Sequence, residues 1–293
     1  MTPYTVLLYH GVHADNLPLD GLNSSGKHIP VSRFRCEMEW LKANRPIVSM
    51  TEIALAHRKI THIPTDAVAV TFDDGFHNVI EHAVPVLREL GIPWTWYLAT
   101  GLIRNAPEDV AKYFKSLHRV TWTDRLEAAI IHGPHYPQLS VEGRIAVFQA
   151  IKADLKATAR FDDVPGIVDI ICGDFKFDHP LYRFASWNDL RGDLGLCDLG
   201  AHTVNHAPIG RCTNWRWEVE FSLKTISHFT GKQCQLFSYP EGLADDFNDE
   251  NIAYLKALRL IHCPTAIEGT NTVEITDPFR IRRSTVPPWT RLD

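Results

Sequence analysis

Short apolar runs alternate along the chain with segments whose apolar residues recur three or four positions apart. The runs at 6–9, 68–72 and 94–98 are rich in β-branched or aromatic residues, which predicts buried strands. The helical spacing at 32–43 and 76–91 predicts a helix between successive strands. This repeated order of strand, helix and strand predicts parallel βα units and therefore an α/β fold.

The same order returns in the last third of the chain. Further short strands are predicted at 47–50, 196–199, 260–263 and 279–283, and at 236–242, where the strand runs into a Pro/Gly turn. Three residues are expected to cap the N-termini of helices: Ser32, Thr51 and Asn248.

Between about 104 and 183 the strand pattern is lost. Helical spacing at 124–131 and 141–157 is separated there by loops that contain proline. We interpret this region as an inserted helical segment that could cap or shape a pocket. The polar stretch 12–29 is predicted to be a loop that could lie over the same site.

Two adjacent carboxylates, Asp73 and Asp74, follow the predicted strand at 68–72. Parallel α/β folds place their chemistry at this end of a strand, and Gly75 permits a sharp turn there. Successive side chains of a strand point to opposite faces, so one carboxylate could hold a cation while the other acts as a base. The alternative is an Asx-type turn that caps the next helix.

A pair of histidines, His202 and His206, follows another predicted strand. Their spacing of four residues corresponds to one helical turn, so both imidazoles can face the same point. One aspartate and two histidines would provide three ligands for zinc or a related metal and leave a position open. In a chain with 15 histidines, chance spacing or a solvated helix face is the alternative explanation.

Composition excludes several classes of protein. The 293 residues are 45% hydrophobic and 22% charged, which is typical of a globular chain. The net charge of −5 without a basic block argues against nucleic-acid binding, and six scattered cysteines without a C-x2-C pair suggest reduced thiols. No run reaches the ~18 apolar residues of a membrane span, and the N-terminus lacks the features of a signal sequence. A soluble, cytoplasmic protein is therefore expected.

The motifs together resemble the polysaccharide deacetylases, also known as the NodB-homology carbohydrate esterases. TFDDG at 71–75 resembles the family's first motif, HTVNH at 202–206 the second, and FSYPEG at 237–242 the third. LYHGV at 8–12, WTDRLE at 122–127 and DPFR at 277–280 resemble segments of the exopolysaccharide and O-antigen cluster members. The resemblance implies a distorted (β/α)7 barrel in one domain, 1–293, with the helical insertion at about 104–183.

The resemblance also implies an activity, namely the metal-dependent removal of an acetyl group from an N-acetylated sugar. It assigns Asp74, His202 and His206 as metal ligands and Asp73 as the general base. Zinc is the first choice of metal, and nickel, cobalt or manganese would suit the same ligands. The oxyanion would be held by the metal and by a backbone N–H from 239–241.

The chain departs from the family pattern in two catalytic positions. The third motif usually begins with an arginine that orients the base, but Ser238 occupies that position, so Arg282 or Arg283 could supply the positive charge. The late Leu-x-His motif that provides the general acid has no clean match. His262 and His10 are rival candidates, and for each a structural role is the alternative.

Four residues are expected to bind the substrate: Tyr239, Pro240, Glu241 and Arg283. Because a cytoplasmic enzyme would meet a precursor and not a finished wall polymer, we expect a nucleotide-linked or lipid-linked sugar of surface polysaccharide or O-antigen (lipopolysaccharide) biosynthesis. Two other functions stay open. One is a catalytically inactive carbohydrate-binding protein on the same scaffold, and the other is a related hydrolase for a different amide or ester.

Overall fold

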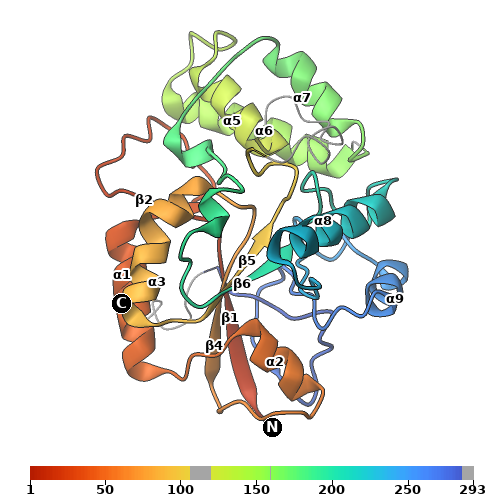
Figure 1. The fold of residues 1–293 in the computed structure, drawn as a ribbon. Helices are drawn as coiled ribbons and strands as arrows, with labels where there is room; N and C mark the ends of the chain where they lie inside the picture. Colours follow the sequence, from red (N-terminus) through yellow and green to blue (C-terminus); the bar gives the residue numbers. More distant parts are fainter. Residues whose placement is uncertain (106–119, 159, 286–293) are drawn as a thin grey trace.

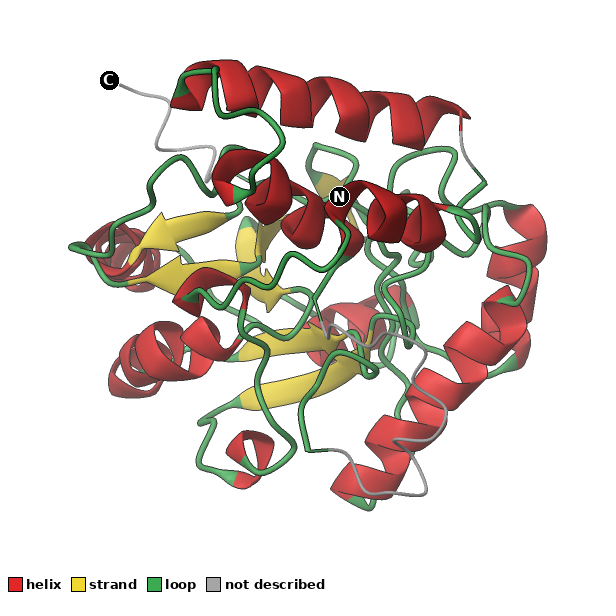
Figure 2. Cartoon of the chain, turned by 90° about the horizontal axis from the view of Figure 1, so that it is seen from above, coloured by secondary structure: helices red, strands yellow, loops and turns green. Residues whose placement is uncertain are grey.

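The computed structural model describes residues 1–105, 120–158 and 160–285. At its centre lies a five-stranded sheet in the order β6-β5-β4-β1-β7, surrounded by helices (Figures 1 and 2). The first four strands in this order pair in parallel with their neighbours, and the last strand, β7, pairs antiparallel to β1. The strands are β1 (Pro3–Tyr9), β4 (Ala67–Phe72), β5 (Trp94–Leu98), β6 (Cys197–Ala201) and β7 (Asn271–Thr272). The predicted α/β fold with parallel strands is confirmed.

Single parallel bridges continue this sheet beyond β6. They join Ala201 to Phe237, Leu236 to His262, Pro264 to Ile281, and Ser284 to Leu7 of β1. The strands predicted at 236–242, 260–263 and 279–283 are therefore reduced to isolated bridges in irregular chain. The strand predicted at 47–50 is likewise one bridge, from Ile47 to Val68. The regular sheet alone does not establish a seven-stranded barrel.

The helices around the sheet follow the predicted spacing, with corrections at their ends. They are α1 (Val31–Asn44), α2 (Met50–His57), the π-helix η1 (Val79–Ala83), α3 (Val84–Leu90), α8 (Trp215–Thr230) and α9 (Asp249–Ala257), with 3-10 turns η2 (Pro180–Tyr182) and η3 (Asp189–Arg191). Asn248 caps α9 as predicted. The other two predicted caps are wrong, because Pro30 precedes α1 and Ser49 forms a capping box with Glu52 at α2.

Three helices of the region 104–183 pack together beside the ends of the strands (Figure 1). They are α5 (Trp122–His132), α6 (Val141–Thr158) and α7 (Val164–Cys172). The helices predicted at 124–131 and 141–157 are thus confirmed. Leu126, Phe148 and Val168 belong to an apolar cluster that α5, α6 and α7 share, separate from the main core. This helical group has a core of its own.

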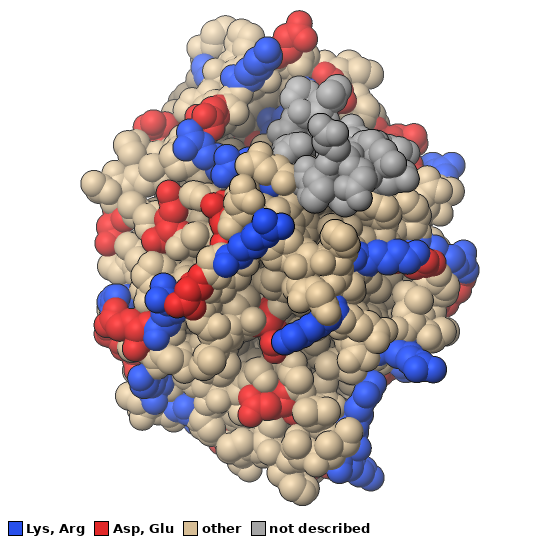
Figure 3. Space-filling model, viewed as in Figure 1, with Lys and Arg blue, Asp and Glu red and all other residues tan. Residues whose placement is uncertain are grey.

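The loop predicted at 12–29 contains two short strands, β2 (Gly11–His13) and β3 (His28–Pro30), which pair in parallel. Among the described residues, no helix is long and apolar enough to cross a membrane. On the face shown in Figure 3, basic and acidic side chains are interspersed. That face therefore carries no extensive patch of one sign.

Candidate active site

The first motif is a strained turn at the end of β4. Asp73 and Asp74 are buried, with 2% and 0% of their surface exposed. Asp74 has a φ of 73° and Gly75 a φ of 109°. A Cβ on Gly75 would lie 2.6 Å from Ile103 Cδ1, so only glycine fits this turn without strain. The turn holds the two carboxylates in a fixed position at the carboxyl edge of the sheet.

The second motif is also a turn, and not the helical turn that its spacing suggested. His202 follows β6, and the next residues form consecutive turns. Thr203 and His206 have φ values of 59° and 55°, in the left-handed region that non-glycine residues seldom adopt. Such strain is common at functional sites, where the surrounding structure enforces it. The two imidazoles meet because the chain reverses, with ring centroids 5.0 Å apart.

Glu218 of α8 holds this histidine turn. Its carboxylate accepts hydrogen bonds from the backbone N–H of Val204 at 2.8 Å and of Asn205 at 2.9 Å. It also accepts one from Asn205 Nδ2 at 2.7 Å. The sequence did not point to Glu218, because helical spacing alone cannot distinguish a buried glutamate from a solvated one.

Asp74, His202 and His206 form a group that can hold a metal ion, since their ligand atoms lie within 4.8 Å of one another. Asp74 Oδ1 lies 3.2 Å from His206 Nε2 and 3.5 Å from His202 Nε2, yet it has no hydrogen-bond partner. His202 Nδ1 lies 2.9 Å from the carbonyl oxygen of Ser238, so it can donate there and leave Nε2 free to bind a metal. The donor set and the unpartnered buried oxygen fit a divalent metal.

The pKa shifts of Asp74 and His202 favour the protonation states that bind a metal, whereas the shift of His206 reflects its contact with the charged Asp74 carboxylate. Burial raises the pKa of Asp74, but Lys27 and His206 outweigh burial and hold it well below its usual value. Burial lowers the pKa of His202, which favours the neutral imidazole that a metal requires. Burial also disfavours charge on His206, but Asp74 outweighs it and raises that pKa.

Asp73 is held by Arg283 and not by the third motif. Arg283 donates to Asp73 Oδ1 at 2.9 Å and to Oδ2 at 2.6 Å, a bidentate pair. The same guanidinium donates to Ser238 Oγ at 3.0 Å, so it fills the space beside the small residue of that motif. Burial raises the pKa of Asp73, but Arg283 and His202 lower it by more than burial raises it, so the carboxylate stays charged.

Of the two arginines considered, Arg283 therefore supplies the positive charge, and Arg282 is exposed. The Arg283 side chain has 0% of its surface exposed and does not line the cavity. The expectation that Arg283 binds the substrate is corrected: it contacts the base from the protein side.

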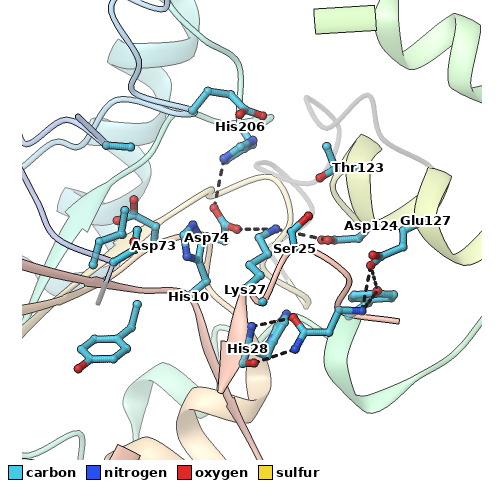
Figure 4. A pocket seen from close by; sticks show the side chains of 18 of the residues that line it. His10, Ser25, Lys27, His28, Asp73, Asp74, Thr123, Asp124, Glu127 and His206 are labelled. Atoms are coloured by element: carbon cyan, nitrogen blue, oxygen red, sulfur yellow. Dashed lines mark hydrogen bonds and ion pairs between the residues drawn. The ribbon is translucent and has the colours of Figure 1, made fainter. Parts of the chain in front are cut away.

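A cavity of about 430 Å³ opens over both carboxylates (Figure 4). The helical group contributes part of its wall. The polar residues that line it include His10, Lys27, His28, Asp73, Asp74, Asp124, Glu127, Lys152, Lys156, His202, His206, Tyr239 and Glu241. The stretch 12–29 and the helices α5 and α6 thus meet at the site that the first two motifs form.

Lys27 is a cavity residue that the sequence did not single out. Its Nζ lies 3.1 Å from Asp74 Oδ2 and 3.3 Å from Asp124 Oδ1 (Figure 4). Burial disfavours the ammonium, but Asp124 and Asp74 outweigh burial and raise the pKa of Lys27. Its position inside a polar loop carries no periodic signal, so only the folded chain reveals this contact.

The two candidate acids occupy different places. His10 lies at the end of β1 and lines the cavity, where burial lowers its pKa to about 4. His262 is fully buried and is not among the residues that line the cavity. Burial lowers its pKa to about 3, and its ring lies edge-on to Tyr97. The structure brings only His10 to the carboxylates, and it places His262 in the core.

The third motif contributes Tyr239 and Glu241 to the cavity wall, whereas Pro240 is buried outside it. Tyr239 N–H donates to the carbonyl of Pro264 at 3.3 Å, and Pro240 has no N–H. Within the described residues, Glu241 N–H has no acceptor, which makes it the candidate donor of this motif. The Glu241 carboxylate forms an ion pair with Lys156.

The comparisons with known proteins agree with this geometry. The model of the family "Polysaccharide deacetylase" matches residues 62–122. A poly-beta-1,6-N-acetyl-D-glucosamine N-deacetylase of Escherichia coli (strain K12) is 28% identical over 107 residues, which are 34% of this chain and 16% of that protein. The enzyme of the same name from Staphylococcus aureus (strain MSSA476) is 30% identical over 70 residues, 24% of each chain. This chain thus aligns with only a small part of these relatives' length.

Solved structures share the fold over nearly the whole chain. The deacetylase PplD of Streptococcus pyogenes, in complex with acetate, matches with a TM-score of 0.61 at 13% identity and covers 96% of this chain and 91% of its own. IcaB from Ammonifex degensii matches with a TM-score of 0.60 at 17% identity and covers 99% and 94%. The resemblance to the polysaccharide deacetylase family is confirmed.

Proposed function

We propose that this chain is a metal-dependent hydrolase that removes the N-acetyl group of an amino sugar in a polysaccharide or its precursor. One observation carries the proposal: a single cavity exposes a charged carboxylate, Asp73, beside a complete metal-ligand group. The names of the relatives, which are N-deacetylases of poly-beta-1,6-N-acetyl-D-glucosamine, support the reaction and the class of substrate.

Asp74, His202 and His206 would hold the metal, for which zinc is our first choice, with nickel, cobalt or manganese as alternatives. When bound, a divalent metal polarises the carbonyl of the substrate and makes water easier to deprotonate. Asp73 accepts that proton, and Arg283 keeps the carboxylate charged and oriented. Glu241 N–H, for which the described residues offer no acceptor, would donate to the developing oxyanion.

His10 is our candidate for the general acid that protonates the leaving amine, because it lines the cavity whereas His262 does not. A free amine leaves poorly without a proton, so an acid on this side of the substrate is required. With a pKa of about 4, His10 is neutral before the substrate binds. It must therefore gain its proton within the substrate complex.

The proposal extends to the fold. We infer a distorted (β/α)7 barrel in one domain, 1–293, with a helical insertion at about 104–183. The parallel bridges that lead from β6 through Phe237, His262 and Ile281 back to β1 support the barrel. The separate apolar cluster of α5, α6 and α7 supports the insertion.

For the physiological substrate, we retain a nucleotide-linked or lipid-linked precursor of a surface polysaccharide such as O-antigen, in the cytoplasm. The relatives named above act on poly-N-acetylglucosamine, so the polymer is the competing substrate. The cavity of about 430 Å³ has room for a single sugar residue, which both kinds of substrate present.

The test is acetate release from β-1,6-linked N-acetylglucosamine oligosaccharides and from N-acetylated nucleotide sugars. Release that stops with a chelator and returns with zinc is the expected result. Asp73→Asn is expected to abolish release and to retain zinc, because Asp73 is the base and not a ligand. Zinc binding by the wild type without acetate from any substrate would instead support the inactive carbohydrate-binding protein.

A further inference from the structure

Lys27 is a cation placed between two carboxylates of different elements. Its side chain is 19% exposed, and its Nζ lies 3.1 Å from Asp74 Oδ2 and 3.3 Å from Asp124 Oδ1. Asp74 belongs to the metal-ligand group at the end of β4, whereas Asp124 belongs to α5 of the helical group. Two buried carboxylates therefore share one ammonium, and none of the steps proposed above uses it.

The loop that carries Lys27 is attached to α5 independently of Asp74. The carboxylate of Glu127, also on α5, accepts hydrogen bonds from the backbone N–H of Asn23 at 3.2 Å and of Ser24 at 2.9 Å. Tyr182 O–H donates to the same carboxylate. Glu127 is buried and Asn23 and Ser24 are half-buried, so these bonds are partly shielded from solvent. Lys27 is thus held at the cavity by contacts that a metal ion would not disturb.

The two oxygens of Asp74 face different partners. Oδ1 faces His202 and His206, and Oδ2 faces Lys27. A divalent cation at Oδ1 would repel the ammonium at Oδ2, because the low dielectric of a buried site screens like charges weakly. Asp124 offers the ammonium a second partner on the side away from the histidines. The ammonium can therefore stay in the cavity after a metal binds.

We propose that Lys27 is a positioning residue of the metal centre, which neutralises Asp74 in the metal-free protein and is held by Asp124 when a divalent metal is bound. This inference rests on the metal site of the proposed function, but not on the reaction. It assigns the helical group a part in metal binding, because α5 provides the carboxylate that retains the cation.

The proposal predicts opposite effects of two substitutions on zinc affinity, measured by competition with a chromogenic chelator. Lys27→Met leaves Asp74 without a counter-ion in the metal-free protein, so zinc is expected to bind more tightly by about tenfold or more, the scale on which partners of metal ligands act. Asp124→Asn leaves the displaced ammonium without an anionic partner, so zinc is expected to bind more weakly by about tenfold. Lys27→Arg retains the charge and is expected to remain close to the wild type.

The metal-free proteins provide a second measurement that needs no activity. Lys27→Met is expected to lower the Tm of the metal-free protein. The buried Asp74 carboxylate loses its cation in this variant and gains no contact with water in exchange. Zinc is then expected to raise the Tm of this variant by more than it raises that of the wild type. In the double variant with Lys27→Met, the effect of Asp124→Asn on zinc affinity is expected to disappear.

Lys152→Met is the matched control. Lys152 lines the same cavity, but its Nζ contacts Ser25 Oγ at 3.0 Å and none of the three ligands. Its loss is expected to leave zinc affinity within about twofold of the wild type. Weaker zinc binding by both Lys27→Met and Asp124→Asn would show a purely structural role and overturn the inference. Zinc binding with these opposite effects but without acetate release would refute the proposed function and leave the inference intact.

Discussion

Replacing Arg283 with methionine tests how the base is held. The guanidinium is fully buried and makes two hydrogen bonds to Asp73. It also donates to the carbonyl of Thr265 at 2.6 Å and to Ser238 Oγ at 3.0 Å. Methionine keeps much of the apolar stem and removes every one of these donors. The Asp73 carboxylate would stay buried without its cation.

The expected cost follows from this geometry. Breaking a buried ion pair by removing one partner lowers the free energy of unfolding by about 3–5 kcal/mol. The pKa of Asp73 is also expected to rise, because burial, which raises it, would no longer be opposed by Arg283. A carboxylate protonated near neutral pH cannot act as a base, so the acid limb of the activity profile should move to higher pH.

Two assays check these expectations: urea unfolding at pH 7 and acetate release as a function of pH. Arg282→Met is the matched control, since Arg282 is the exposed neighbour and is expected to change stability by no more than about 0.5 kcal/mol. Because Arg283→Met could fail to fold, the double variant with Asp73→Asn removes the unpaired charge and is expected to recover stability. An Arg283→Met protein with wild-type stability and an unshifted pH profile would refute the reasoning.

Three further substitutions test other parts of the site and core. Glu218→Gln should lower the free energy of unfolding by about 1–3 kcal/mol in urea, since an amide nitrogen would replace one of the two oxygens that accept from the histidine turn and the negative charge would be lost; an unchanged midpoint would contradict this role. Gly75→Ala should cost about 1–3 kcal/mol, because φ is 109° and Ile103 leaves no room; wild-type stability would contradict it. His262 has a pKa of about 3 when folded and about 6.5 when unfolded, so the unfolded chain binds its proton first and stability is lost as pH falls from 6.5 toward 3. In His262→Leu, the free energy of unfolding should therefore fall less steeply over this pH range, by about 1.4 kcal/mol per pH unit. A pH dependence of unfolding equal to that of the wild type would contradict this role of His262.

Local patterns in the sequence were sufficient to predict several elements. The apolar runs at 68–72 and 94–98 became β4 and β5, because a run that is buried on both faces favours a strand wherever it lies in the sheet. The helices at 124–131 and 141–157 followed from spacing alone. The predictions failed where tertiary packing replaced regular pairing, as in the single bridges at 236–242 and 279–283.

For the candidate site, the sequence by itself determined which residues could bear the chemistry. Asp73, Asp74, His202 and His206 stand out because two short motifs place unusual polar groups directly after apolar strands. Chain geometry then brings the ends of parallel strands to one edge of the sheet. That much needs only the order of residues and the rules of parallel βα folds.

Only the tertiary structure decided how those groups are held. Arg283 is 210 residues from Asp73, and Lys27 is 97 residues from Asp124. A contact across such a separation depends on the whole fold, so no spacing within the sequence encodes it. Burial is decided in the same way, since His10 lines the cavity and His262 lies in the core although each follows an apolar run. Residue type and local order therefore specify the candidates, and packing selects their partners, their exposure and their charge.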